Sequence, residues 1–241
     1  MLKIDAQETF EGDGVVVQRL FPIAGRRHFD PFVLWDHFDL APGRGFPDHP
    51  HRGFEAVTYL FSGSMQHTDN LGNHSRVEAG GAQAFCAGRG LVHSEMPDEV
   101  NRSAGIQLWI NLKRDLKTVA PRYQQALGSE LPSTVFEGGR VTTIVGEDSP
   151  IQLHNAICYQ HLQLDADASY SIALSAADRA LIYVVSGALT GHGQQLEQHQ
   201  AWLVEQGGAD LHIQASQASE VMLCVGKPHK EPIVQHGPFV D

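Results

Sequence analysis

Two short motifs carry side chains that bind transition metals. His49 and His51 flank a proline in "FPDHPHRGFE", and His93 and Glu95 flank a serine in "GRGLVHSEMP". Side chains at positions i and i+2 of a β-strand point to the same face, so each motif would direct two ligands into one cavity. Three imidazoles and one carboxylate suit iron(II), manganese, copper, nickel, cobalt or zinc, and the set does not choose among these metals.

The segments around both motifs are predicted to be β-strands. Runs rich in β-branched and aromatic residues, such as "AVTYLFSG" and "ALIYVVSG", recur along the chain with Gly, Asn, Asp or Pro between them. This pattern favours an all-β sandwich or barrel. Helical periodicity is scarce, and the main exception is "DLKTVAPRYQQALGSEL" (115–131), which we expect to be a connector with a short helix.

The chain also resembles itself. The segment "FEAVTYLFSG" (54–63) matches "RALIYVVSG" (179–187) at an offset of 124 residues, and a looser match between 77–85 and 196–204 has an offset of 119. Such repeats predict two similar β domains in tandem, joined near residues 115–134. We place the N-terminal domain at 1–125 and the C-terminal domain at 126–241.

The same offsets predict that the second domain has lost the metal motifs. Ala173 and Ser175, which cannot replace imidazoles at a metal, would take the positions of the first histidine pair. His212 and Gln214 would take the positions of the second motif. The C-terminal domain is therefore expected to hold at most one stray histidine and no metal site.

Composition and charge exclude several classes of protein. The formal net charge of −11 argues against direct contact with nucleic acid or with an anionic membrane surface, because both need clustered Lys and Arg. No apolar run approaches the roughly 20 residues that span a bilayer, and the N-terminal residues lack the apolar core of a signal peptide. We expect a cytoplasmic protein whose Cys86, Cys158 and Cys224 are reduced, buried thiols.

The motifs and their surroundings resemble a known superfamily. The spacing of glycines and histidines over 45–63 and 81–93 is similar to the two signature motifs of the cupins. More specifically, "FPDHPHRGFE", "AGRGLVHSEMP", "GIQLWINL" and "EPIVQHGPFV" closely resemble pirin family proteins. The resemblance covers nearly the whole chain. It implies a bicupin of two double-stranded β-helix (jelly-roll) barrels with few short helices, and one metal, usually iron, in the N-terminal barrel.

Carried over residue by residue, the resemblance assigns the four metal ligands. They are His49, His51, His93 and Glu95, with Fe(II) as the expected metal and Cu, Mn, Ni, Co or Zn as alternatives. Glu55 occupies a position that supplies a ligand in many other cupins. Because pirins use the later carboxylate, we expect Glu55 to lie beside the ligands without binding the metal.

The resemblance also implies an activity, since several pirins act as quercetin 2,3-dioxygenases. Four protein ligands leave open positions on such a metal, and its remaining positive charge would attract a phenolate-type oxygen. We therefore expect a metal-dependent enzyme that opens the ring of a flavonol such as quercetin with O2 and releases carbon monoxide. Glu95, or less favourably Glu55, would take the proton of the flavonol 3-hydroxyl group.

Two other functions fit the same ligands. Pirins also resemble regulators that bind a transcription factor or a metabolic enzyme, with the metal as a redox sensor, and the acidic charge permits protein partners. An isomerase or other small-molecule enzyme would use the metal as a Lewis acid.

The remaining histidines and the tryptophans are interpreted as structural. We expect Trp35, Trp109 and Trp202 to be core residues, and the tail "HGPFV" to pack against the body, with His236 unassigned. Hydrogen bonding at the surface or in the core is expected for His67, His74, His154, His161, His192, His199 and His229.

Overall fold

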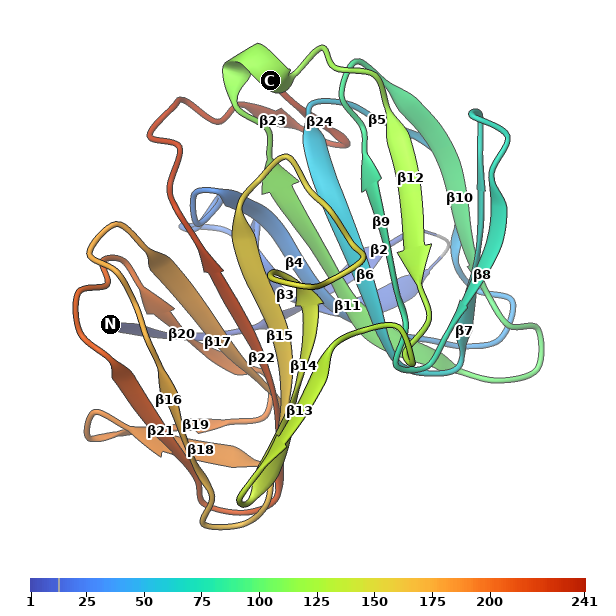
Figure 1. Cartoon of the computed structure of the whole chain (residues 1–241). Coiled ribbons are helices and arrows are strands. Elements are labelled where there is room, and N and C mark those ends of the chain that lie inside the picture. Colours follow the sequence, from blue (N-terminus) through green and yellow to red (C-terminus); the bar gives the residue numbers. More distant parts are fainter. Residues whose placement is uncertain (13) are drawn as a thin grey trace. The chain divides into compact units, whose positions relative to one another are not determined.

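The computed structural model of the protein describes residues 1–12 and 14–241. The chain divides into two compact units. The N-terminal barrel comprises residues 7–130, 153–155 and 229–241, and the C-terminal barrel comprises residues 1–6, 131–152 and 156–228. Each unit contains a seven-stranded and a four-stranded antiparallel sheet, which confirms the expected all-β, two-barrel architecture (Figure 1).

In the N-terminal barrel the larger sheet has the order β12-β9-β6-β11-β4-β3-β2, and the smaller sheet has the order β5-β10-β7-β8. The central strand β6 is buried along most of its length, which explains its nearly continuous apolar sequence. The strands are β2 (Gln7–Glu11), β3 (Val15–Phe21), β4 (Phe32–Leu40), β5 (Phe46–His51), β6 (Phe54–Ser62), β7 (Ser64–Asp69), β8 (His74–Glu78), β9 (Ala82–Cys86), β10 (Leu91–Pro97), β11 (Ser103–Asn111) and β12 (Arg122–Ala126).

The C-terminal barrel repeats this plan, with the orders β1-β20-β17-β22-β15-β14-β13 and β16-β21-β18-β19. Its interior is a continuous apolar cluster that includes Trp202, Leu189 and Leu223. The strands are β1 (Leu2–Asp5), β13 (Ser133–Phe136), β14 (Gly139–Val145), β15 (Ile157–Leu164), β16 (Ser169–Ile172), β17 (Arg179–Ser186), β18 (Ala188–Gly191), β19 (Gln194–Glu197), β20 (Gln200–Val204), β21 (Leu211–Ala215) and β22 (Ser219–Gly226).

The connector differs from the prediction. Its helical part is a single 3-10 turn, η1 (Arg114–Leu116), and the segment predicted to continue the connector forms β12, which pairs with β9. Because β12 completes an edge of the N-terminal barrel, the boundary lies between Glu130 and Leu131 instead of between residues 125 and 126. None of the described residues forms a helix with the length and apolar character needed to cross a bilayer.

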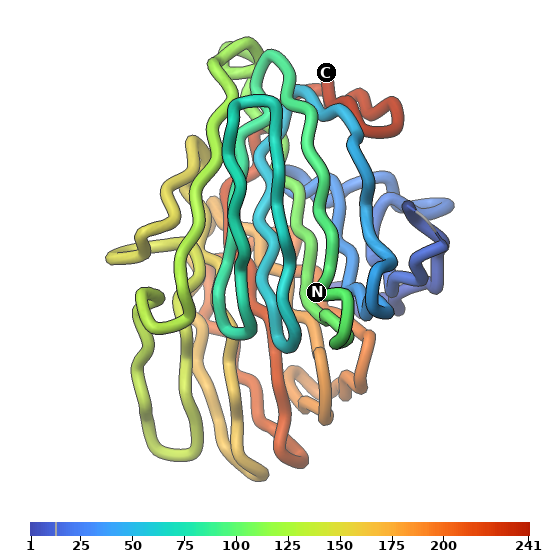
Figure 2. The backbone as a smooth tube through the Cα atoms, turned by 90° about the vertical axis from the view of Figure 1, so that its right-hand side faces the viewer, coloured from blue at the N-terminus to red at the C-terminus, as the bar shows by residue number. Residues whose placement is uncertain are grey.

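The last residues of the chain belong to the N-terminal barrel. They form a small hairpin of β23 (Gln235–His236) and β24 (Phe239–Val240), beside the end of β5 (Figures 1 and 2). The amide of Val240 donates to the carbonyl of Arg52 over 3.0 Å, and the Arg52 guanidinium lies over the Phe239 ring. The tail therefore packs against the body of the protein beside the His49–His51 motif.

Candidate metal centre

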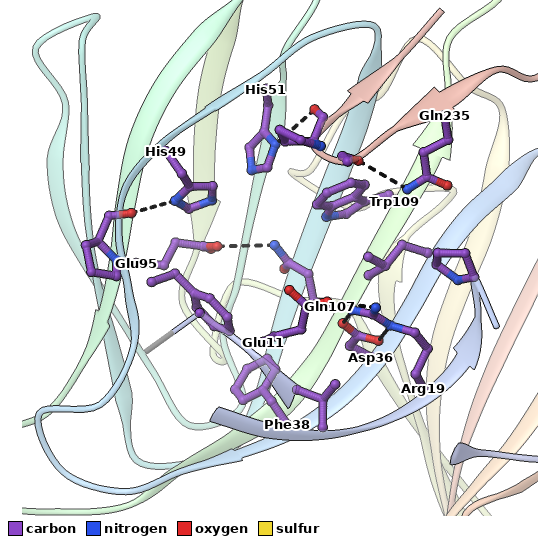
Figure 3. Close-up of a pocket in the computed structure, with 18 of the residues that line it drawn as sticks. Glu11, Arg19, Asp36, Phe38, His49, His51, Glu95, Gln107, Trp109 and Gln235 are labelled. Atoms are coloured by element: carbon purple, nitrogen blue, oxygen red, sulfur yellow. Dashed lines mark hydrogen bonds and ion pairs between the residues drawn. The ribbon is translucent and has the colours of Figure 1, made fainter. Parts of the chain in front are cut away.

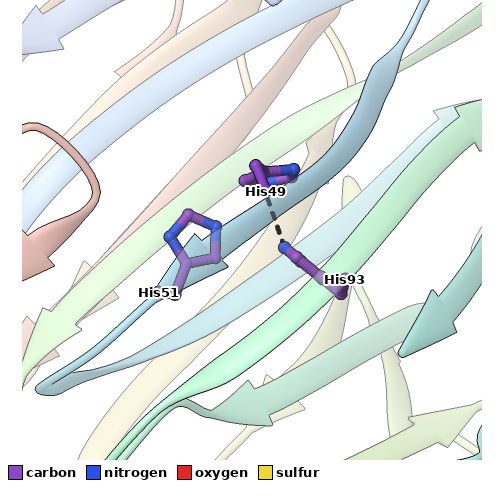
Figure 4. Close-up of side chains that lie close together, drawn as sticks. All are labelled: His49, His51 and His93. Atoms are coloured by element: carbon purple, nitrogen blue, oxygen red, sulfur yellow. Dashed lines mark hydrogen bonds between the residues drawn. The ribbon is translucent and has the colours of Figure 1, made fainter. Parts of the chain in front are cut away.

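Two adjacent strands bring the histidine motifs together. β5 and β10 are antiparallel neighbours, with His49 directly opposite His93 and His51 opposite Leu91. The ligand nitrogens of His49, His51 and His93 lie within 4.8 Å of one another, and His51 and His93 are buried (Figure 4). The alternation of side chains along each strand explains why all three imidazoles reach one face.

Each imidazole is held through its Nδ1 atom. Nδ1 of His49 donates to the carbonyl of Pro47 over 2.7 Å, and Nδ1 of His51 donates to the carbonyl of Pro238 over 3.3 Å. Nδ1 of His93 lies 3.4 Å from Nδ1 of His67. These contacts place the proton of each neutral ring on Nδ1 and leave Nε2 as an acceptor.

The three Nε2 atoms cannot form hydrogen bonds with one another. Nε2 of His49 and Nε2 of His93 are 3.1 Å apart, and two unprotonated nitrogens cannot form a hydrogen bond. Nε2 of His51 is buried and has no hydrogen-bond partner among the described residues. Buried acceptors that converge without a donor are what a metal cation satisfies, so these residues fit a metal ion.

The electrostatics keep two of the rings neutral. Burial, followed by the nearby His49, lowers the pKa of His51 to about 3. Burial, followed by His51 and His49, also holds the pKa of His93 far below its ordinary value. Neutral imidazole is the form that binds metals, so both side chains are ready to do so at neutral pH.

The structure confirms the expectation that His67 forms hydrogen bonds in the core, and it also places this residue beside His93. It is buried on β7, next to β10, and its ring stacks on Tyr123 with centroids 4.0 Å apart. Nε2 of His67 donates to Oδ2 of Asp69 over 3.1 Å, so its Nδ1 is free to accept from His93. The sequence did contain a signal, because "HTD" has the same i, i+2 spacing as the other two motifs.

Glu95 lies in the same region but beside different partners. Its carboxylate groups with His67 and His93, and a bulge in the pairing with β5 separates it from the His49–His93 pair. Oε1 accepts from Thr58 and Gln83, and Oε2 accepts from Gln107 over 3.2 Å. These three donors orient the carboxylate, and its role as fourth ligand stays a prediction.

Glu55 points away from this cluster, contrary to our expectation. It follows Phe54, whose ring contacts His51, and successive residues of a strand face opposite sides. Its buried carboxylate accepts from the backbone amides of His154 and Asn155 over 2.8 and 3.1 Å, and from Asn155 Nδ2 over 2.9 Å. Glu55 therefore anchors segment 153–155, and a role in proton transfer at the histidines is excluded by its position.

The C-terminal barrel has an apolar core at the positions that correspond to the four expected ligands. The repeat offsets of 124 and 119 residues, from which we predicted the corresponding residues, are each one residue too long in these strands. Met65 pairs with Pro97, and Leu189, which follows the equivalent Ser-Gly turn, pairs with Ala215. Pro97 therefore corresponds to Ala215, and four residues earlier in each strand His93 corresponds to Leu211. His93 pairs with His49 and Leu211 pairs with Ile172, so Ile172 corresponds to His49. A shift of one residue exchanges the two faces of a strand, so Ala173, Ser175, His212 and Gln214 are exposed. The four inward positions are Ile172, Leu174, Leu211 and Ile213.

A cavity of about 740 Å³ adjoins the histidines (Figure 3). Such a volume is typical of sites that bind small molecules. Trp109, which we predicted to be a core residue, is largely buried but lines this cavity, and its ring stacks on Phe54 with centroids 4.1 Å apart. The lining also includes His49, His51, Glu95, Gln107, Leu34, Phe38 and Pro238.

The chain is similar to known proteins over most of its length. The family model "Pirin" matches residues 14–110, and the model "Pirin C-terminal cupin domain" matches residues 159–241. Mouse pirin is 37% identical over 99% of this chain and 86% of its own length. A Pseudomonas aeruginosa protein named "Putative quercetin 2,3-dioxygenase" is also 37% identical, over 95% of this chain and 87% of its own length.

Solved structures show the same fold. A quercetin 2,3-dioxygenase from Acinetobacter baumannii superposes with a TM-score of 0.90 at 26% identity, covering 100% of this chain and 90% of that chain. The Escherichia coli pirin YhhW in complex with nickel(II) superposes with a TM-score of 0.77 at 24% identity, covering 92% and 96% of the two chains. The matched family models and the identity to curated relatives show that this chain belongs to the pirin family.

Proposed function

We propose that this protein is a metal-dependent dioxygenase that opens the ring of a flavonol such as quercetin with O2 and releases carbon monoxide. The observation that carries the proposal is the cluster of three histidines, two of which, His49 and His51, line a cavity large enough for an aromatic ligand. The names of the Pseudomonas and Acinetobacter relatives support the same reaction.

His49, His51 and His93, which lie in one group, would hold the metal together with Glu95, which lies in a second group that shares His93, and Fe(II) is the first expectation. When bound, the metal would supply a positive charge for a phenolate oxygen and a redox centre for O2. Glu95 is the candidate proton acceptor for the ligand's 3-hydroxyl group, because Oε2 has one hydrogen-bond donor, Gln107, among the described residues. Gln107 and Gln83 fix the carboxylate in the orientation that this transfer needs.

The cavity wall would orient the aromatic ligand and exclude water. Apolar side chains from three strands line it, namely Val17 of β3, Leu34 and Phe38 of β4, and Trp109 of β11. A planar ligand held between such walls keeps its reacting carbons in one position. The backbone at Gly237 and Pro238 completes the wall beside His51.

Quercetin turnover tests the proposal. The purified protein is analysed for bound metal, and the loss of the visible quercetin band is then followed with and without O2. We expect O2-dependent loss with the metal-loaded protein, and no loss after His49→Ala. His74→Ala is the matched control, because His74 is exposed on β8 and should leave turnover unchanged. Equal turnover by the His49→Ala variant would reject the proposal.

A further inference from the structure

The cavity has a second polar cluster, formed by Glu11, Arg19 and Asp36 on β2, β3 and β4. Nε of Arg19 donates to Oδ1 of Asp36 over 2.7 Å, and Nη2 donates to Oδ2. Nη1 of Arg19 pairs with Oε1 of Glu11 over 2.7 Å. Figure 3 shows this cluster across the cavity from His49 and His51, with Gln107 between them.

The cluster offers acceptors to a ligand. Two carboxylates surround one guanidinium, so the local charge is negative although Arg19 and Asp36 are both buried. Burial raises the pKa of Asp36 to about 6, against the effect of the Arg19 pairing, so its carboxylate is still ionised at neutral pH. The other charged residues in the cavity lining, apart from Glu95, are Arg27 and Asp48, which cancel.

The cavity wall between the histidines and the Glu11–Arg19–Asp36 cluster contains a hydrogen-bond donor, Nε1 of Trp109. Nε1 of Trp109 is buried and has no hydrogen-bond partner among the residues that the structure describes. A buried indole N–H normally has a partner, and here the side chain lines the cavity. An oxygen atom of a bound ligand would supply the missing acceptor.

We propose that Glu11, Arg19 and Asp36 form a subsite for the phenolic hydroxyl groups on the ligand ring that lies away from the histidines, while Trp109 donates to an oxygen of the ligand core. The inference rests on the proposed function and adds the residues that would recognise the outer ring of the flavonol. Each such hydroxyl can donate to a carboxylate oxygen, and hydrogen bonds to charged acceptors are stronger than neutral ones.

The same charges disfavour other ligands. A carboxylate on the outer ring would face Glu11 and Asp36, and like charges at close range repel. An unsubstituted ring would give these carboxylates no donor beyond Arg19 and would displace the water that hydrates the partly exposed Glu11 carboxylate. The cavity should therefore prefer quercetin over 3-hydroxyflavone, and 3-hydroxyflavone over its 4′-carboxyl derivative.

Binding measured without turnover tests this order. The zinc-loaded and the metal-free proteins are titrated with the three ligands by calorimetry, so that no redox chemistry is needed. Glu11→Gln is the test variant, because the Glu11 side chain is 39% exposed and its loss should not unfold the protein. Glu8→Gln on the same strand is the matched control, since Glu8 is exposed and does not line the cavity.

We expect the wild-type protein to bind quercetin about tenfold more tightly than 3-hydroxyflavone, the effect of one hydrogen bond to a charged acceptor. Glu11→Gln should remove most of this preference and improve binding of the carboxyl derivative, while Glu8→Gln changes neither.

Trp109→Phe should weaken the binding of quercetin and of 3-hydroxyflavone by a similar factor and keep the preference for quercetin. Equal affinities for quercetin and 3-hydroxyflavone in the wild type, or an equal loss for both in Glu11→Gln, would overturn the subsite. If the preference is found but quercetin is not consumed, the proposed reaction fails and the subsite stands.

Discussion

The imidazoles of His49, His51 and His93 share one arrangement, in which Nδ1 is tied to a partner and Nε2 points to the others. Two of the partners are backbone carbonyls, and the third is His67, itself fixed by Asp69. Although burial would raise the pKa of Asp69, hydrogen bonds from Asn73, His67 and Leu71 hold it below its ordinary value. Asp69 is therefore a permanent acceptor that keeps the proton of His67 on Nε2.

Replacing His67 tests this arrangement. In His67→Phe the stacking on Tyr123 can persist, but Nδ1 of His93 loses its acceptor. We expect metal affinity, measured by competition with a chelator, to fall about 10- to 100-fold, as for other residues that orient a metal-bound histidine. His74→Phe on the neighbouring strand is the control and should bind metal normally. Unchanged affinity in His67→Phe would show that the contact has no role in orienting His93.

The cysteines provide a second test at this scale. Burial raises the pKa of Cys86 to about 11 and that of Cys224 well above its ordinary value, so their thiolate fractions at pH 8 are very small. Cys158 is only partly buried. A thiol reagent at pH 8 should therefore modify at most one thiol of the native protein, at Cys158, and all three after unfolding in guanidinium. Rapid modification of Cys86 in the folded protein would contradict this burial.

At the scale of elements, the C-terminal hairpin contacts the histidine cluster. The carbonyl of Pro238 accepts from Nδ1 of His51. Nζ of Lys117 links the hairpin to the barrel, because it donates to the carbonyls of Val240 and Gly53 and to Oδ1 of Asn111. Three donors on one ammonium group meet three oxygens. The position of β24 therefore influences both the orientation of His51 and the shape of the cavity.

Two glycine-to-alanine substitutions distinguish the effect of displacing the C-terminal hairpin from the effect of backbone strain alone. Gly53 has φ +83°, and a Cβ atom there would collide with the carbonyl oxygen of Val240. Gly25 has φ +79°, and a Cβ atom there would meet nothing within 4 Å. Both Gly→Ala changes should cost about 1 kcal/mol through the left-handed conformation. Only Gly53→Ala should also displace the hairpin.

Limited proteolysis and metal titration provide the measurements for this pair. Gly53→Ala should expose residues 229–241 to cleavage and weaken metal binding, while Gly25→Ala should match the wild type in both assays. If the two variants behave alike, the hairpin does not support His51.

At the scale of the whole molecule, the chain has two barrels of the same topology, and among the described residues the three clustered histidines lie in the N-terminal barrel. The C-terminal barrel carries four aliphatic residues at the positions of the ligands. We expect one metal ion per chain by elemental analysis, and the same value for His212→Ala, because His212 is exposed on the outer face of β21. A second equivalent that His212→Ala removes would contradict the assignment.

Metal removal should lower stability by an amount that grows with the logarithm of the metal affinity. A ligand present at 100 times its Kd stabilises the folded state by about 2.7 kcal/mol, which corresponds to a Tm shift on the order of 5–10 °C for a chain of this size. Scanning calorimetry with added metal and with EDTA should show this shift in the wild type and none in His49→Ala. A shift of equal size in His49→Ala would place the bound metal elsewhere.

The sequence by itself determined the fold class and the repeat, because strand alternation and turn residues are local patterns that a short window contains. It also placed His49 and His51 on one face, since spacing within a strand fixes the side to which a side chain points. The tertiary structure decided what depends on pairing between distant strands. It brought His67 beside His93, turned Glu55 toward Asn155, exposed His212, and set Pro238 and the Glu11–Arg19–Asp36 cluster around one cavity. Strand register and bulges determine these contacts, and a one-residue difference in register exchanges an inward-facing side chain for one on the surface.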